Sequence, residues 1–137
     1  MKFQIYNFKF LSQEAINGIW GSDLMSDQGT TRFRLDIRGE QEILDPTPQQ
    51  IKLAIDSISP SDDSPFLILD KGDGMTYMQA GLEENSLWTL EFQEGSLQRH
   101  FQVSNVSTEK VTDMFLAYAA GDEAWRTSVK WEHIDIE

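Results

Sequence analysis

The chain has 137 residues, no cysteine and a formal net charge of −12, with 39% hydrophobic and 25% charged residues. These totals predict one globular domain over residues 1–137, and they exclude a disulfide framework and thiolate metal sites. The excess of carboxylates argues against nucleic acid or an anionic membrane as a partner, because both are bound through Lys and Arg contacts to phosphate. It favours a basic protein partner, although solubility alone also explains such a charge.

The first ten residues, MKFQIYNFKF, contain no continuous apolar segment and no small-residue cleavage site, so we expect no signal peptide. No window approaches the ~20 apolar residues of a membrane-spanning helix. Together with the lack of cysteine, these features predict a soluble protein of the cytoplasm.

Two strands are predicted before the first helix, over residues 2–10 and 31–38. In the second, TRFRLDIR, every other residue from Phe33 to Ile37 is apolar, which is the period-2 pattern of a half-buried strand. The residues between these strands, 11–30, contain three glycines and are predicted to form a long loop.

The clearest predicted helix follows in DPTPQQIKLAIDSISP. Thr47 is a favourable N-cap that can form a Thr-x-x-Gln capping box with Gln50, and Pro60 ends the helix. Apolar residues recur at helical spacing between them: Ile51, Ala54, Ile55 and Ile58.

Four strand-like segments with short connections come next: Phe66–Leu69, Met75–Ala80, Leu87–Gln93 and Arg99–Val103. Short connections predict antiparallel neighbours and hence a meander. In the third segment the alternation predicts Trp88, Leu90 and Phe92 inward and Thr89, Glu91 and Gln93 outward.

The segment Asp70-Lys71-Gly72-Asp73-Gly74 could be a cation loop, a catalytic carboxylate pair or a hairpin turn. A calcium-binding EF-hand requires a glutamate at position twelve, where this chain has Gly81 when Asp70 is position one. Asp and Gly tolerate the backbone angles of tight turns, so a hairpin turn between two strands is favoured.

A second helix is predicted from Ser107 to Gly121, with apolar residues at helical spacing, and a last strand over Ser128–Ile134. The fold class is therefore α+β: an antiparallel sheet of about six to seven strands, with a central meander, packed against two amphipathic helices.

No catalytic motif is present, and we predict no enzyme, no metal site and no cofactor. His100 lies in a strand without ligands or a nucleophile at metal or catalytic spacing, which is typical of a surface or hydrogen-bonded histidine. Arg32, Arg34 and Arg38 lie on one strand face and are interpreted as the solvated face of an edge strand, although they could bind phosphate or carboxylate groups.

Aromatic and acidic residues gather near the C-terminus: Trp125 and Trp131, with Asp122, Glu123, Glu132, Asp135 and Glu137. Core packing is the simpler role for both tryptophans. Because Trp is enriched at interfaces, aromatic anchors flanked by carboxylates would also suit a partner groove lined with Arg and Lys.

Residues 91–132 carry an Glu-Gly-Ser turn, an Arg-His strand, a helix ending Tyr-Ala-x-Gly-Asp, then Trp125-Arg126 and Trp131-Glu132. This region resembles the C-terminal half of small bacterial immunity proteins from polymorphic toxin systems, and the layout from about residue 45 fits the same family. The resemblance implies a non-enzymatic protein that binds and neutralises a toxin in the cytoplasm. It gives weight to Tyr118, Trp125, Arg126 and Trp131.

Three interpretations follow. The preferred one is an immunity-like protein that holds a cognate basic toxin, with Trp125, Arg126, Trp131, Asp122, Glu123 and Glu132 at the contact. The alternative is a small-ligand domain or enzyme that binds an anion in a sheet–helix cleft through Arg32, Arg34 and His100. The third is a homodimer formed through an exposed strand edge.

Overall fold

The computed structural model describes residues 33–135. The strand predicted over residues 2–10, the loop predicted over residues 11–30 and Arg32 lie outside the described part. The elements in chain order are β1 (Arg34–Ile37), β2 (Gln41–Leu44), α3 (Pro48–Ser57), β3 (Phe66–Asp70), β4 (Thr76–Leu82), β5 (Trp88–Glu94), β6 (His100–Val106), α4 (Thr108–Ala120), the short 3-10 helix η2 (Glu123–Arg126) and β7 (Glu132–His133).

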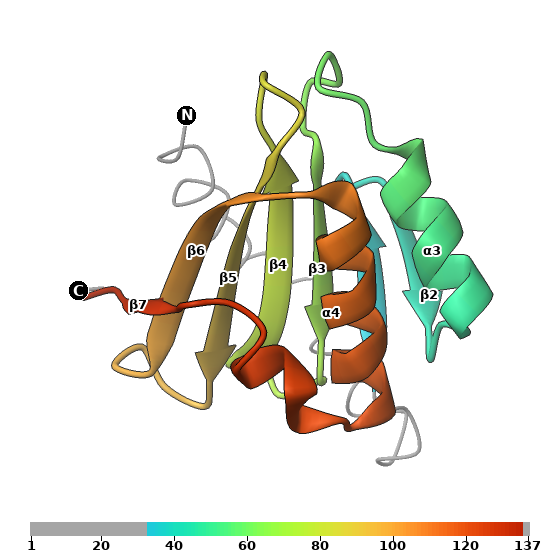
Figure 1. The fold of residues 1–137 in the computed structure, drawn as a ribbon. Coiled ribbons are helices and arrows are strands. Elements are labelled where there is room, and N and C mark those ends of the chain that lie inside the picture. Colours follow the sequence, from blue (N-terminus) through green and yellow to red (C-terminus); the bar gives the residue numbers. More distant parts are fainter. Residues whose placement is uncertain (1–32, 136–137) are drawn as a thin grey trace.

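The strands form one antiparallel sheet in the order β2-β1-β3-β4-β5-β6-β7. Strands β3 to β6 are joined by short connections, which is the predicted meander. Helices α3 and α4 lie against the same face of the sheet, and they contact each other (Figure 1). The predicted α+β class, with two helices on an antiparallel sheet, is confirmed.

Both helices begin and end as local chemistry dictates. Thr47 and Gln50 form the capping box at the start of α3, with each side chain bonded to the other's backbone N–H. Ser107 caps α4 by accepting from the Lys110 N–H. Gly121 ends α4 with a φ of 78°, a left-handed conformation in which a side chain would be strained.

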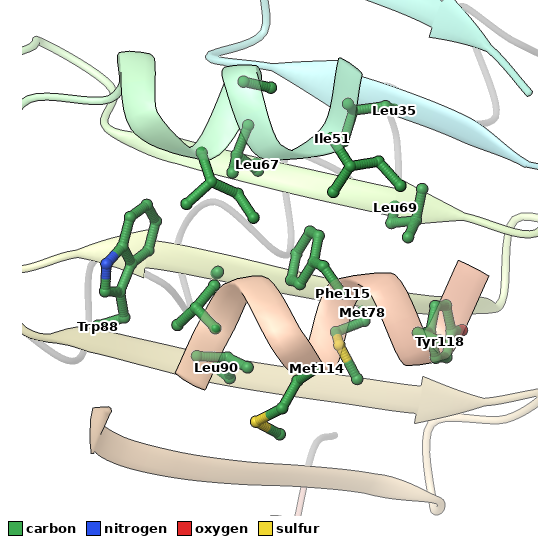
Figure 2. Packing of buried hydrophobic residues seen from close by; sticks show 14 of the residues in the cluster. Leu35, Ile51, Leu67, Leu69, Met78, Trp88, Leu90, Met114, Phe115 and Tyr118 are labelled. Carbon is green, nitrogen blue, oxygen red and sulfur yellow. The ribbon is translucent and has the colours of Figure 1, made fainter. Parts of the chain in front are cut away.

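The hydrophobic core lies between these helices and the sheet (Figure 2). Leu67, Met78 and Leu90 come from neighbouring strands, and Phe115 of α4 packs against them with no exposed surface. Trp88 is also buried, and its indole N–H donates to Thr108 Oγ1 at 2.9 Å. Apolar burial of this extent is the main force that holds α+β layers together.

Strand β2 was not predicted, and it changes the position of β1 in the sheet. Because β1 pairs with β2 on one side and β3 on the other, it is not an edge strand. The interpretation of Arg34 as part of a solvated edge is therefore wrong: its side chain is 1% exposed and donates to Glu42 of β2 at 2.7 Å. Only four residues form β2, too few to show a clear period.

The C-terminal strand is shorter than predicted. Of Ser128–Ile134, only Glu132–His133 form β7, where they pair with Phe101 and Gln102 of β6. The preceding residues follow η2, whose first turn is capped by the Asp122 carboxylate accepting from the Ala124 N–H at 2.9 Å.

The segment after β3 is a hairpin turn, as predicted, because β3 and β4 pair antiparallel across it. Asp70 contributes to this turn as predicted, because its side chain accepts from the backbone N–H of Gly72. It is the last residue of β3, it is paired in register with Tyr77, and it is fully buried.

Candidate functional site

The face of the sheet opposite the helices carries an unusual concentration of buried polar side chains. We call this set the polar face: Arg34, Asp70, Gln79, Thr89, Glu91, Gln93, His100 and Gln102, all 0–7% exposed. They reach one face because strand residues two apart point the same way. Thr89, Glu91 and Gln93 point away from the helices, as their alternation predicts, but they are buried.

Strand register aligns the polar face in two rows across the sheet. In the first row, Arg34, Asp70, Tyr77, Gln93 and His100 lie opposite one another on five successive strands. Residues directly opposite on one face are the closest side-chain neighbours that a sheet provides. The row therefore brings together groups that are up to 66 positions apart in the sequence.

The second row runs beside the first and contains Asp36, Ile68, Gln79, Glu91 and Gln102. Glu91 is its centre. Its Oε2 accepts from Gln102 Nε2 at 2.9 Å, and its Oε1 lies 3.5 Å from Gln79 Nε2. Amide donors from both flanking strands therefore contribute to the solvation of this buried carboxylate.

His100 and Glu91 form a buried pair that links the two rows. His100 Nε2 lies 2.5 Å from Glu91 Oε1, and both side chains are 0% exposed. His100 Nδ1 lies 3.1 Å from Gln93 Oε1. Because Gln93 Nε2 donates to the Met75 carbonyl at 3.0 Å, the oxygen of this amide is turned toward the imidazole. An imidazolium that donates to both oxygens satisfies this geometry.

This arrangement is unsuited to acid–base catalysis. A general base must present a nitrogen to a substrate proton, and both nitrogens of His100 face oxygens of neighbouring side chains inside the protein. The prediction of a hydrogen-bonded histidine therefore holds. Within the described residues, no group of three or more His, Asp or Glu side chains is placed to hold a metal ion.

Two carboxyl groups near the polar face are shifted toward the protonated form. Burial raises the pKa of Asp70 to about 7, and the backbone N–H of Gly72 opposes this shift. Burial also raises the pKa of Asp36 to about 6; the N–H of Gly39 opposes this shift, and the charge of Glu42, directly opposite on β2, adds to it. The carboxyl groups of Asp70 and Asp36 therefore titrate closer to neutrality than an ordinary aspartate does.

The residues of the alternative ligand site are only partly brought together. Arg34 and His100 share the first row, but they are four strands apart and both are buried. Arg34 donates to Glu42, and His100 is paired with Glu91. No described side chain of this set is presented to solvent for an anionic ligand.

The C-terminal aromatic residues form a second cluster, on the helix side of the sheet. The ring of Trp125 lies edge-on to Phe92 at 4.8 Å, to Tyr118 at 5.3 Å and to Trp131 at 6.1 Å. We call these four residues the Trp125 cluster. Trp125 is 3% exposed and Trp131 is partly buried, so the larger part of this cluster packs inside the protein.

Arg126 covers the solvent-facing side of the Trp125 cluster. Its guanidinium lies 4.5 Å from the centre of the Trp125 ring and pairs with Glu94 and with Glu123. The carboxylates of Glu94 and Glu123 raise the pKa of Arg126. Burial opposes the ionisation of Glu94, but the hydrogen bonds and charges of Arg126 and Arg99 hold the pKa of Glu94 below its usual range. Arg126 therefore fastens η2 to the end of β5 through charge and stacking.

Of the predicted acidic contact residues, Asp122 and Glu123 lie at the start of η2 beside this cluster, whereas Glu132 lies opposite Gln102 of β6 and so on the polar-face side of the sheet. Asp122, Glu123 and Glu132 are exposed, and Asp122 caps η2. Sequence reasoning missed Glu94, which pairs with both Arg99 and Arg126, and it missed Glu91 as the partner of His100. The Glu-Gly-Ser turn at residues 94–96 was the sequence signal that could have pointed to these contacts. A hairpin at this turn pairs β5 with β6 and places Gln93 opposite His100.

Comparison of the chain with protein-family models, with curated proteins and with solved structures finds no match. In the part of the chain that the structure describes, no helix has the length and apolar character needed to cross a bilayer.

Proposed function

We propose that this protein is a non-enzymatic, immunity-like binding protein that neutralises a cognate basic toxin by direct contact in the cytoplasm. The contact surface is the exposed rim of the Trp125 cluster, formed by Trp131, Asp122 and Glu123 with Arg126, and it continues around the sheet edge to Glu132, which follows Trp131 in the chain. The toxin covers this rim with Lys and Arg side chains, and the half-buried Trp131 supplies the apolar contact.

The observation that carries the proposal is the distribution of charge pairing. Each of the four arginines in residues 33–135 is already held in an ion pair: Arg34 with Glu42, Arg38 with Glu40 and Asp62, Arg99 with Glu94, and Arg126 with Glu94 and Glu123. Ion pairing neutralises the field of a cation at a distance. Each such pair is neutral as a unit, so these arginines present little positive charge to a partner, and the net charge of the chain stays at −12.

Carboxylates, by contrast, remain available at the surface. Exposed acids that make no ion pair with any described residue include Asp56, Asp63, Asp73, Glu84, Glu109, Asp113, Asp122, Glu132 and Asp135. A net charge of −12 attracts a basic protein and speeds the encounter at low salt. The buried pairing of His100 supports a binding role over a catalytic one.

Co-expression with the product of the adjacent gene tests the proposal. We expect this product to co-purify with the chain and its toxicity to be relieved. Glu132→Lys reverses a charge on the rim and should weaken co-purification, while Glu84→Lys, in the turn between β4 and β5, changes the same net charge away from the rim and should retain it. Failure to co-purify, with toxicity unrelieved, would overturn the proposal.

A further inference from the structure

The polar face is buried although α3, α4 and η2 all lie on the other side of the sheet (Figure 1). Strand side chains stand roughly perpendicular to their sheet, so their tips meet whatever lies above it. An antiparallel sheet that packs helices on one side commonly keeps its other face in water. Glu91, Gln93 and His100 are nevertheless 0% exposed within a single chain. The layer that covers them therefore belongs to this chain.

Three apolar residues on the same side of the sheet also require neighbours. Phe66, Ile68 and Tyr77 form a cluster of their own, apart from the core beneath the helices, and they are 9%, 1% and 0% exposed. A fully buried side chain usually touches about 6–12 other residues. Three side chains do not by themselves supply so many contacts. The covering layer must therefore present apolar side chains to Ile68 and Tyr77.

The covering layer must also bring hydrogen-bond donors. Asp70 Oδ2 and Gln79 Oε1 are buried and accept from no described residue. Buried polar atoms almost always have a hydrogen-bond partner, because burial without one is costly. The carboxyl groups of Asp36, Asp70 and Glu91 all stand on this side of the sheet. A cover that suits this surface combines apolar side chains with donors and positive charge.

Residues 1–32 and 136–137 are the parts of the sequence outside the described range. Neighbouring strands lie about 4.8 Å apart, so the five strands from β1 to β6 that carry the polar face span about 19 Å. Residues 136–137 reach about 7 Å when extended, whereas residues 1–32 reach about 100 Å. Residue 32 is joined through Phe33 to Arg34, which is itself a member of the polar face. Residues 1–32 therefore have both the length and the starting point to cover this surface.

The sequence of residues 1–32 also has the chemistry that this side of the sheet requires. Its first thirteen residues contain two lysines and no acid, whereas all 23 acidic residues of the chain come after them. Within residues 2–10, apolar and donor side chains occur side by side: Phe3, Ile5, Phe8 and Phe10 with Lys2, Gln4, Asn7 and Lys9. The apolar members suit the cluster of Ile68 and Tyr77, and the lysines and amides are donors for Asp70 and Gln79.

We propose that residues 1–32 lie over the polar face and are the layer that buries it. The sheet is then covered on both sides, by α3 and α4 on one and by the N-terminal segment on the other. The pair of His100 and Glu91 is enclosed between the sheet and this segment. The polar face is thus an interface within the chain, whatever partner binds the rim of the Trp125 cluster.

Nuclear Overhauser effects in the isotope-labelled full chain test this arrangement. We expect contacts from the Ile68 methyl groups and the Tyr77 ring to residues 1–32. Leu67 and Leu69 are the controls, because they lie on the same strand as Ile68 but pack beneath the helices, and they should show no such contacts (Figure 2). A sample that mixes labelled and unlabelled chains separates contacts within a chain from contacts between chains. Absence of contacts from Ile68 and Tyr77 to residues 1–32, or contacts seen only between chains, would overturn the proposal.

Two matched substitutions provide a second measurement. Ile68→Glu puts a charge beneath the proposed cover, whereas Leu53→Glu puts the same charge at a position of α3 that is 57% exposed. Trypsin cleavage after Lys9 follows release of the segment, and cleavage after Lys110 of α4 follows global unfolding. We expect Ile68→Glu to raise the first rate relative to the second by at least about tenfold, because an unpaired carboxylate is costly to bury, and Leu53→Glu to leave this ratio unchanged. Equal ratios in the two variants would contradict the proposal, and the contacts in the unmodified protein do not depend on how Ile68→Glu folds.

Discussion

Removal of His100 should reveal how strongly the polar face depends on its buried pair with Glu91. His100→Leu retains the approximate volume of the side chain but leaves Glu91 as a buried carboxylate without the imidazole at 2.5 Å. Breaking one side of a buried pair costs about 3–5 kcal/mol, because the remaining charge loses that partner while it stays in a buried place. The amides of Gln79 and Gln102 still face Glu91, which places the expected loss in the lower half of this range.

A second substitution, at Glu91, tests whether the pair is ionic. Adding Glu91→Gln to His100→Leu replaces the stranded charge by a neutral amide, so the double variant should be more stable than His100→Leu by about 1–2 kcal/mol. Most second substitutions in a core destabilise further. Recovery of stability therefore identifies the pair as ionic.

Denaturation in urea at pH 7, followed by tryptophan fluorescence, measures these differences because the chain has four tryptophans. His133→Leu is the control: His133 is exposed on β7, where its ring contacts the Gln98 carbonyl, and its loss should cost less than about 1 kcal/mol. The reasoning would be refuted if His100→Leu cost less than about 1 kcal/mol, or if Glu91→Gln destabilised it further.

Three further predictions concern stability. The pKa of Asp36 is raised from 3.8 to about 6, so the folded state binds more protons than the unfolded state between these pH values. The free energy of unfolding should therefore fall as pH rises from 4 to 6. In urea denaturation, Asp36→Asn should be as stable as the unmodified protein at pH 4 and more stable at pH 8. Thr47→Ala removes the capping box of α3 and should cost about 1 kcal/mol; an unchanged urea midpoint would contradict this. Trp125→Ala empties the centre of the Trp125 cluster and should cost about 3–5 kcal/mol, visible as a lower melting temperature, whereas a loss under about 1 kcal/mol would place Trp125 outside the core.

The elements that were predictable are those whose signals are local. The capping box of Thr47 and Gln50 and the glycine at position 121 mark helix ends within a few residues. The meander followed from short connections between alternating strands. These signals act through the backbone of neighbouring residues, so tertiary contacts do not override them.

The polar face was not predictable, because strand alternation assigns side chains to two faces but does not say whether a face is buried. Glu91 and Gln93 alternate with Leu90 and Phe92, and such a pattern usually places polar residues in water. Inside the protein Glu91 is bonded to His100, nine residues away and on another strand, and to the amides of Gln79 and Gln102. Charge pairing of this kind depends on register, which a single strand does not encode.

The prediction for Arg34 was wrong for a related reason. A strand with several arginines reads as an edge, but β2 follows β1 after a tight turn and covers that edge with Glu42 as a counter-ion. The segment Gln41–Leu44 is too short and too polar to be recognised alone. Its role is visible only when the two strands are considered as a pair.

The affinity of the purified chain for the adjacent gene product, measured over a range of salt concentrations, tests the proposed function most directly. The account predicts a complex whose Kd rises steeply with salt and rises further in Glu132→Lys but not in Glu84→Lys. No complex at low salt, or an affinity that ignores both salt and Glu132, would contradict it.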